Sequence, residues 1–220
     1  SSDLLRLFDR YKVPVTVFGV AMAMERNPDV VEAMLEVGHE IASHGWRWIN
    51  YQDVSERVER EHMARAIDIH KRLTGQRPLG WYTGRTSPNT RRLVADDGGF
   101  LYDADDYCDD LPFWTEVNRR PHLIVPYTLE ANDMRFSGTG LNTGEQFYSY
   151  LKDAFDVLYE EGQDRPKMLS IGLHCRIVGR PGKMAGLERF IRYALGHQDV
   201  WFARRVEIAK HWRERHPYER

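Results

Sequence analysis

Short, wholly apolar runs alternate with amphipathic stretches along most of the chain, and this alternation limits the possible folds more than any other feature. Residues 13–19 form a β-branched run that is too apolar for a strand with one face in water, so they predict a strand covered on both faces. An amphipathic helix is expected over 27–37, with Gly38 placed for a left-handed C-terminal cap. This order predicts βαβ units, and hence a parallel sheet or barrel covered by helices.

The same alternation continues to the end of the chain. Capping-box patterns at Asp53 with Glu56 and at Thr143 with Gln146 predict the starts of two long helices. The polar and aromatic stretch 107–121 is expected to be an inserted loop. We expect further strands at 39–43, 79–82, 99–103, 122–126, 168–173 and 200–202, and helices at 4–8, 53–75, 88–95, 143–162, 184–195 and 205–215.

Size and charge exclude several classes of protein. The 220 residues carry 31 basic and 33 acidic side chains, a net charge of −2, so the chain lacks the broad cationic surface that binds nucleic acid or anionic lipid. The longest apolar stretch, 13–24, is shorter than the roughly 20 residues that a bilayer requires, and it is not a signal peptide. Two cysteines in the whole chain are typical of a reducing compartment, so we expect a cytoplasmic protein.

No repeat or linker divides the sequence, so a single catalytic domain over 1–220 is expected. The chain opens at Ser1, directly before a helical pattern and without an initiator methionine. We therefore expect a truncated N-terminus.

Two histidines stand at the ends of predicted strands, where binding groups gather in parallel α/β folds. His44 and His174 at one rim suit an acid/base pair, although each can also be a buried neutral imidazole that the backbone satisfies. His39 points to the other face of its extended strand from His44 and is expected to be structural. Cys175 faces away from His174 along a strand, which places its thiol poorly for proton transfer to that imidazole.

Other strand ends carry polar and aromatic groups. Arg85 either binds an anionic or carbonyl oxygen through its planar fork or lies on the surface beside a helix start. Aromatic side chains near a rim form walls for a planar ring or a sugar face, although they more often belong to the core. The remaining strand-end groups are Trp46, Trp48, Trp81, Tyr82, Trp114, Asp103, Asp105, Asp106, Asn132 and Asp133.

Four motifs in sequence order resemble those of the polysaccharide deacetylase family: Thr16-Val-Phe-Gly19, Gly38-His-Glu-Ile-Ala-Ser-His44, Gly99-Phe-Leu-Tyr-Asp103 and Leu169-Ser-Ile-Gly-Leu-His174. The resemblance implies a distorted (β/α) barrel that here lacks its first strand, with catalytic motifs at the strand ends. It also implies a metal held by an aspartate of the first strand and by two histidines with three residues between them. His44 matches the first histidine, but Trp48 stands at the second position, and the acidic motif would precede residue 1.

Longer strings are similar to the branch of this family that contains metal-independent allantoinases of purine breakdown. They include Ser43-His-Gly-Trp-Arg-Trp48, Gly80-Trp-Tyr-Thr-Gly-Arg-Thr-Ser-Pro88, Asp110-Leu-Pro-Phe-Trp114, Asn132-Asp-Met-Arg-Phe136 and Leu173-His-Cys-Arg-Ile-Val-Gly-Arg-Pro181. This likeness implies hydrolysis of the hydantoin ring of allantoin to allantoate by a cytoplasmic homo-oligomer, with no cofactor and no metal.

Roles follow as hypotheses from that reaction. Opening a cyclic ureide needs a base for water, donors for the carbonyl oxygen and an acid for the leaving nitrogen. We assign proton transfer and substrate polarisation to His174 and His44, with an acidic residue of the absent first strand as another possible base. The expected substrate-binding residues are Arg85, Tyr82, Trp46, Trp81, Trp114, Asn132 and Asp133.

Two other functions stay open at this point. The first is a metal-dependent de-N-acetylase of chitin-like or peptidoglycan sugars, against which Trp48 stands in the ligand position. The second is a ligand-binding barrel without catalytic activity. Metal content and measurable ring opening distinguish the three.

Overall fold

The computed structural model describes residues 2–138 and 140–219, which form two compact units. One unit combines residues 2–13 with 127–202, and the other combines 14–126 with 203–219. Each unit is built from two separate stretches of the chain, so neither is continuous in sequence. A single domain over 1–220 stays a prediction.

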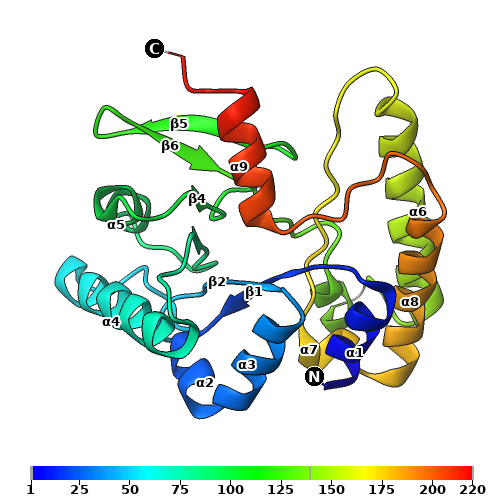
Figure 1. Ribbon diagram of the computed structural model, residues 1–220, viewed down its shortest axis with the longest axis horizontal. Helices are drawn as coiled ribbons and strands as arrows, with labels where there is room; N and C mark the ends of the chain where they lie inside the picture. The colour runs from blue at the N-terminus through cyan, green and yellow to red at the C-terminus, as the bar shows by residue number, and fades with distance from the viewer. Residues whose placement is uncertain (1, 139, 220) are drawn as a thin grey trace. The chain divides into compact units, whose positions relative to one another are not determined.

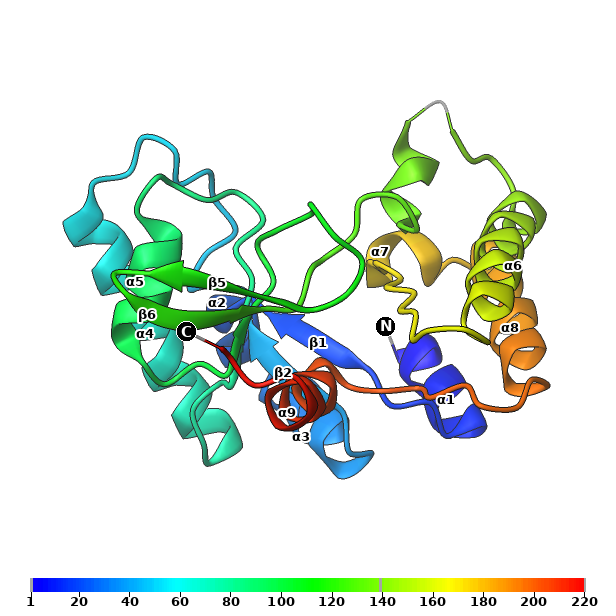
Figure 2. The ribbon, with the colours of Figure 1, turned by 90° about the horizontal axis from the view of Figure 1, so that it is seen from above.

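The second unit contains a six-stranded sheet in the order β1-β2-β3-β4-β6-β5. All neighbouring strands are parallel except β5 and β6, which form the antiparallel hairpin seen in Figure 2. The sheet is open, and β1 and β5 are its outer strands. The α/β class with a parallel sheet is thereby confirmed. The strands are β1 Thr16–Gly19, β2 Glu40–Ser43, β3 Gly80–Trp81, β4 Tyr102–Asp103, β5 Phe113–Val117 and β6 Arg120–Ile124.

Helices connect β1 to β2, β2 to β3 and β3 to β4, as the alternation of the sequence predicts, whereas β5 lies between β4 and β6 in the chain (Figure 1). Gly38 and Gly75 have φ angles of 79° and 78°, the left-handed conformation in which the chain leaves α3 and α4. Met63 on α4 packs with Trp81 and Leu93 in a buried cluster. The helices of this unit are α2 Ala21–Arg26, α3 Pro28–Glu36, α4 Glu56–Thr74, α5 Thr90–Asp97 and α9 Arg205–Arg215.

The strand register aligns the carboxyl ends of the parallel strands. Gly19 pairs with Ser43, Ser43 with Trp81, Trp81 with Asp103, and Asp103 with Ile124. The residue that follows each of these five therefore leaves the sheet at the same edge. This edge carries the candidate site of the second unit.

The first unit is helical, with α6 and α8 side by side in Figure 1. The helices approach so closely that a Cβ atom at Gly186 would meet the backbone of Gly144. The capping box of Thr143 and Gln146 at the start of α6 is confirmed. The elements are α1 Ser2–Tyr11, the 3₁₀ turn η1 Asp133–Ser137, α6 Gly144–Glu161, α7 Cys175–Val178 and α8 Pro181–Leu195.

Several predicted elements are wrong. The apolar run 168–173 makes a single parallel bridge, between Gly172 and Asn132, and no strand forms there or at 200–202. A run becomes a strand only where a neighbour supplies a ladder of hydrogen bonds, and one bridge is not a ladder. The predicted loop 107–121 contains β5. Ser55, and not Asp53, precedes α4, and its side chain makes no capping hydrogen bond.

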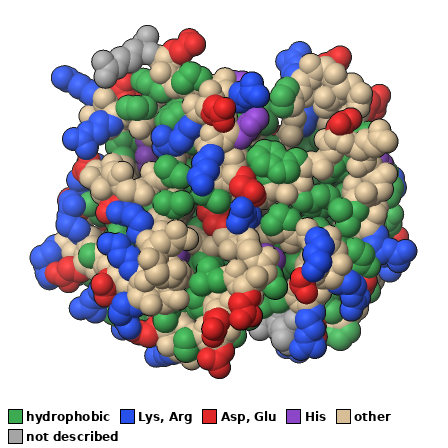
Figure 3. Space-filling model, in the orientation of Figure 1, with side chains coloured by type: hydrophobic (Ala, Val, Ile, Leu, Met, Phe, Trp, Pro, Cys, Tyr) green, Lys and Arg blue, Asp and Glu red, His purple; other side chains and the backbone are tan. Residues whose placement is uncertain are grey.

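The surface of the described residues fits the balanced charge of the sequence. Acidic and basic side chains are interspersed over the face drawn in Figure 3. Among the described residues, each helix is too short or too polar to cross a bilayer.

Candidate active site

His44 leaves the sheet directly after β2, half-buried beside the end of β3. Its Nδ1 lies 2.7 Å from the carbonyl oxygen of Tyr82, and because a carbonyl only accepts, Nδ1 carries the hydrogen. The neutral ring therefore has its lone pair on Nε2. The imidazole also stacks on the ring of Tyr82, with centroids 5.1 Å apart and an interplanar angle of 15°. This environment leaves Nε2 as the atom of His44 that can accept a proton.

Tyr82 contacts side chains from two other segments at this edge of the sheet. Its hydroxyl lies 3.0 Å from that of Tyr107, and its ring lies 5.0 Å from the ring of Phe18. Burial, followed by the nearby carboxylate of Asp105, raises the pKa of Tyr107 despite the hydrogen bond to Tyr82. Either hydroxyl can be the donor of the hydrogen bond that joins Tyr82 and Tyr107. Tyr107 is not among the predicted site residues, because it lies in the stretch 107–121 that was expected to be an inserted loop.

Arg85 lies in the segment between β3 and α5. Its guanidinium carbon stands 4.2 Å from the centre of the Trp48 ring, and both side chains are exposed. Stacking occupies the face of the guanidinium and leaves its N–H groups in the plane for a ligand. In this structure Trp48 therefore packs against Arg85.

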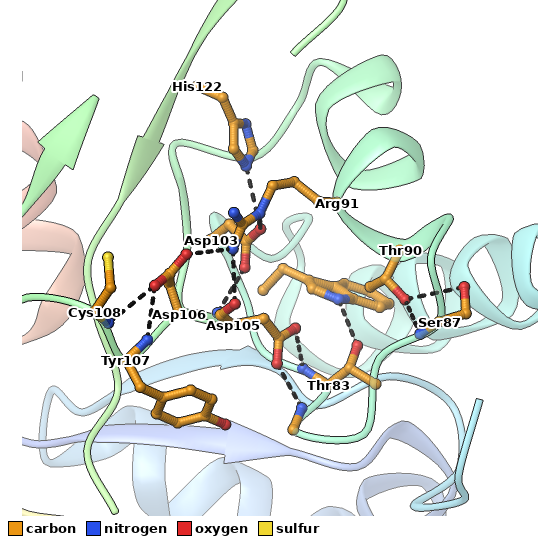
Figure 4. A network of polar contacts seen from close by, with 12 residues as sticks. Thr83, Ser87, Thr90, Arg91, Asp103, Asp105, Asp106, Tyr107, Cys108 and His122 are labelled. Carbon is orange, nitrogen blue, oxygen red and sulfur yellow. Dashed lines mark hydrogen bonds and ion pairs between the residues drawn. The ribbon is translucent and has the colours of Figure 1, made fainter. Parts of the chain in front are cut away.

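Three carboxylates lie beside that segment, of which Asp103 is buried and Asp105 and Asp106 are half-buried (Figure 4). Asp105 accepts the backbone N–H groups of Thr83 at 2.7 Å and Gly84 at 2.6 Å. Its own N–H donates to Asp103, which is fully buried and lies 3.3 Å from Nε2 of His122. Burial, reinforced by the charge of Asp103, raises the pKa of Asp105 to about 7, although the two N–H donors act in the opposite direction.

Arg91 provides the positive charge of this group. It donates to the carboxylate of Asp106 at 2.8 Å and lies 3.7 Å from Asp103. Asp103, Asp105 and Asp106 were expected at a strand end, without a predicted role. His122 and Arg91 were not selected, since the residue types alone do not show that both would contact one aspartate.

In the first unit, His174 is held by a buried aspartate. Asp133, which is fully buried, accepts Nδ1–H of His174 at 2.6 Å. It also accepts the backbone N–H groups of His174 at 2.8 Å and Val178 at 3.1 Å. The imidazole side chain is 26% exposed, and its Nε2 keeps the lone pair in the neutral form. An oriented imidazole backed by a carboxylate is the arrangement of a general base.

Asn132 and Asp133 were both expected to bind substrate. The structure places Asp133 behind His174, and it places Asn132 in the backbone turn before η1. The Asn132 side chain accepts the N–H of Met134 and donates to the carbonyl of Thr128. Both side chains are closed off from solvent, so their contacts position neighbouring residues.

The three tryptophans expected to line the pocket lie in different surroundings. Trp81 is buried in the core, and its indole N–H donates to Thr83 at 2.7 Å. Trp46 packs edge-on against His62 of α4. Trp114 donates its indole N–H to the carbonyl of His216 near the C-terminus. Their roles as pocket walls stay predictions that none of these contacts supports.

The remaining single-residue predictions concern His39 and Cys175. His39 is buried, and its Nδ1 accepts the N–H of Val15, as expected of a structural residue. Cys175 is exposed at the start of α7, where the expected strand is absent. The thiol therefore sits on a helix that follows His174.

The described residues do not fit the metal site that the family resemblance implies. His44 offers one nitrogen, and the indole of Trp48 offers no ligand atom. Within 2–138 and 140–219, no group of three histidine, cysteine or acidic side chains is close enough to hold an ion. Catalytic zinc sites use three protein ligands, and this part of the chain does not supply them.

Two comparisons with known proteins point to polysaccharide deacetylases. The family model "Polysaccharide deacetylase" matches residues 1–99. A putative polysaccharide deacetylase of Schizosaccharomyces pombe is 43% identical over 234 residues, which cover 98% of this chain and 73% of that protein.

Two solved structures have a TM-score of 0.96 and cover 98% of this chain. A probable polysaccharide deacetylase from Pseudomonas aeruginosa is 64% identical, with 73% of its chain covered, and Puue allantoinase is 61% identical, with 72% covered. The fold is therefore the (β/α) barrel type of these proteins, with an open sheet in this chain. The protein belongs to the polysaccharide deacetylase family.

Proposed function

We propose that this protein is a hydrolase that opens the hydantoin ring of allantoin to give allantoate. Its deacetylase and allantoinase homologues point to a hydrolase that acts on C–N bonds, which is the bond class of this reaction. The observation that carries the proposal is the 61% identity to Puue allantoinase over 98% of the chain. Trp48 at the position of the second metal histidine supports it further, because an indole offers no ligand atom.

His174 is the proposed general base. Its Nε2 takes a proton from the attacking water, and Asp133 stabilises the imidazolium that forms. The same nitrogen then returns a proton to the ring nitrogen as the C–N bond breaks. Asp133 keeps the required tautomer throughout, because it accepts from Nδ1.

Tyr82, Arg85 and His44 are the proposed substrate-binding groups. Tyr82 and Arg85 donate hydrogen bonds to the carbonyl oxygens or the ureido tail, and the ring oxygen gains negative charge when water attacks. His44 faces the substrate through Nε2, which accepts from a ring N–H in its neutral form. Donors of this kind commonly contribute about 10² to 10³ in rate each.

The second candidate is a metal-dependent de-N-acetylase. It is favoured by the names of two relatives, which are described as putative and probable polysaccharide deacetylases. Trp48 at the position of a metal ligand is the residue that argues against it.

One assay distinguishes the two. The full chain is incubated with allantoin, hydantoin, succinimide and an acetylated chitooligomer, each with and without a chelator. Opening of allantoin that the chelator leaves unchanged supports the proposal. Release of acetate that the chelator abolishes and zinc restores would replace it with the deacetylase.

A cytoplasmic location and a homo-oligomeric state are also proposed, since both follow from the resemblance to the allantoinase branch. Light scattering on the purified full chain measures the oligomeric state. A monomer at micromolar concentration would contradict that part of the proposal.

A further inference from the structure

The segment 82–90, which we call the β3–α5 segment, contains the two proposed substrate-binding residues of its unit, Tyr82 and Arg85. Gly84 between them has a φ of 72°, and a Cβ atom there would lie 3.0 Å from the Tyr82 hydroxyl. The backbone conformation at this point therefore decides where both side chains stand. Residues outside the segment hold this backbone conformation.

Asp105 holds the first part of the segment. Each oxygen of its carboxylate accepts one of two consecutive N–H groups, Oδ2 from Thr83 and Oδ1 from Gly84. Asp105 is itself oriented through its N–H, which donates to the buried Asp103 at 2.8 Å. Figure 4 shows the carboxylate of Asp105 pointing at the two amides. Two donors on adjacent residues leave this part of the backbone little freedom.

Glu59 holds the second part from α4. Its carboxyl is buried and accepts the hydroxyl of Ser87 at 2.5 Å and that of Thr90. Ser87 and Thr90 are in turn joined, because the N–H of Ser87 donates to the Thr90 hydroxyl at 2.9 Å. Between the two anchors, the carbonyl of Arg85 accepts the N–H of Tyr51 at 3.0 Å.

We propose that Asp105 and Glu59 are positioning residues, which hold the β3–α5 segment so that Tyr82 and Arg85 bind the substrate. This inference rests on the proposed function, since it gives those two side chains their task. Neither carboxyl touches the substrate. Both act through hydrogen bonds to the segment, one to backbone amides and one to side-chain hydroxyls.

The two anchors differ in a way that makes the proposal testable. Backbone N–H groups only donate, so Asp105→Asn leaves one of them facing an NH₂ group. Hydroxyls both donate and accept, so Ser87 and Thr90 can turn to meet the amide of Glu59→Gln. We expect Asp105→Asn to lower kcat/KM by about 10-fold or more, the size of one lost charge-assisted hydrogen bond. Glu59→Gln should stay within about 3-fold, whereas Glu59→Ala should lose about 10-fold.

A matched control is Asp109→Asn. Asp109 also accepts two backbone N–H groups, from Asp110 and Leu111, but through a single oxygen and on the surface. The same change of charge there should leave kcat/KM within about 2-fold, because one amide oxygen can keep both bonds.

A double-mutant cycle separates positioning from a general loss of stability. All rates are normalised to the folded fraction, measured by urea unfolding at the assay temperature. If Asp105 acts through Arg85, Asp105→Asn should cost less than about 3-fold in an Arg85→Ala background. The effect in the otherwise unchanged protein should appear in kcat as well as in KM, since the lost contacts bind the substrate and also stabilise the charge that develops when water attacks.

The outcomes are distinct. Asp105→Asn within 3-fold of an active wild type, or an equal loss with and without Arg85, would overturn the positioning role and leave the allantoinase proposal standing. Equal losses for Glu59→Gln and Glu59→Ala would overturn the role of Glu59. A wild type that opens none of the cyclic substrates would overturn the proposed function first, and the positioning proposal with it.

Discussion

The pairing of Asp133 with His174 predicts a large and specific effect of Asp133→Asn. One carboxylate oxygen accepts Nδ1–H of the imidazole at 2.6 Å. The other accepts the N–H groups of His174 and Val178, at 2.8 Å and 3.1 Å. An asparagine occupies the same space but has only one acceptor oxygen, so it can serve only one of these two sides.

The backbone side decides the orientation of the amide. Leaving a buried backbone N–H without an acceptor costs about 1 to 3 kcal/mol, and here there are two. An imidazole, by contrast, can move its proton. The amide oxygen of the asparagine therefore faces the backbone, its NH₂ group faces Nδ1, and the ring hydrogen of His174 moves to Nε2. The lone pair that would accept the proton from water is then lost.

The expected result is a drop in kcat of about 10³ to 10⁴, comparable to the loss of about 10⁴ caused by the same exchange in a Ser-His-Asp triad. The free energy of unfolding should fall by no more than about 3 kcal/mol, because the backbone bonds survive. Steady-state allantoin hydrolysis gives the rates, and nitrogen NMR of labelled histidine gives the tautomer.

The background His174→Ala is the control. Asp133→Asn should add almost nothing there, since the two residues act as a unit. A loss below 10-fold in the unmodified background, or an Nδ1–H tautomer in the asparagine variant, would refute the reasoning.

Three further changes test other parts of the structure. The pKa of Asp105 is raised to about 7, so its contribution to stability is complete below about pH 4 and is lost as the pH rises through 7. Asp105→Asn should remove this decline from the free energy of unfolding measured in urea at each pH. The same slope of free energy against pH in both proteins would contradict the raised pKa. Gly84→Ala imposes a side chain at φ 72° against the Tyr82 hydroxyl, so it should cost about 1 to 2 kcal/mol of stability and lower kcat/KM; unchanged kinetics would show that the segment tolerates the shift. Gly186→Ala should destabilise the α6–α8 contact by about 1 to 3 kcal/mol, a fall in Tm of about 2 to 4 °C for each kcal/mol, measured by calorimetry; an unchanged Tm would mean that the helices move apart freely.

The parallel strands and most helices could be predicted because their signals are local. An apolar run such as β1 and a glycine such as Gly75 at the end of α4 act within a few residues. The hairpin β5–β6 was missed because its two-residue turn is Asn118-Arg119, with φ angles of 51° and 60°. A turn of this type is usually recognised by a glycine at its second position. Arg119 occupies that position here, so the sequence does not predict the turn.

The positions of the site histidines could be predicted, but their hydrogen-bond partners could not. His44 and His174 were selected because they follow apolar runs, and this selection needed no knowledge of their partners. The carbonyl of Tyr82 and the carboxylate of Asp133 are 38 and 41 residues away from them. Contacts at that separation depend on strand register and on the path of the backbone, which composition and periodicity do not encode.

The alignment of the strand ends has a kinetic consequence. The pairing of β2 with β3 brings His44 and Tyr82 level, and the pairing of β3 with β4 places Asp105 one residue further along. Each pairing closes a loop of about 20 to 40 residues, whereas the helices between the strands depend on neighbouring residues alone. Long loops close late, after local structure has formed. During refolding from urea, the helical circular-dichroism signal should therefore recover before catalytic turnover does.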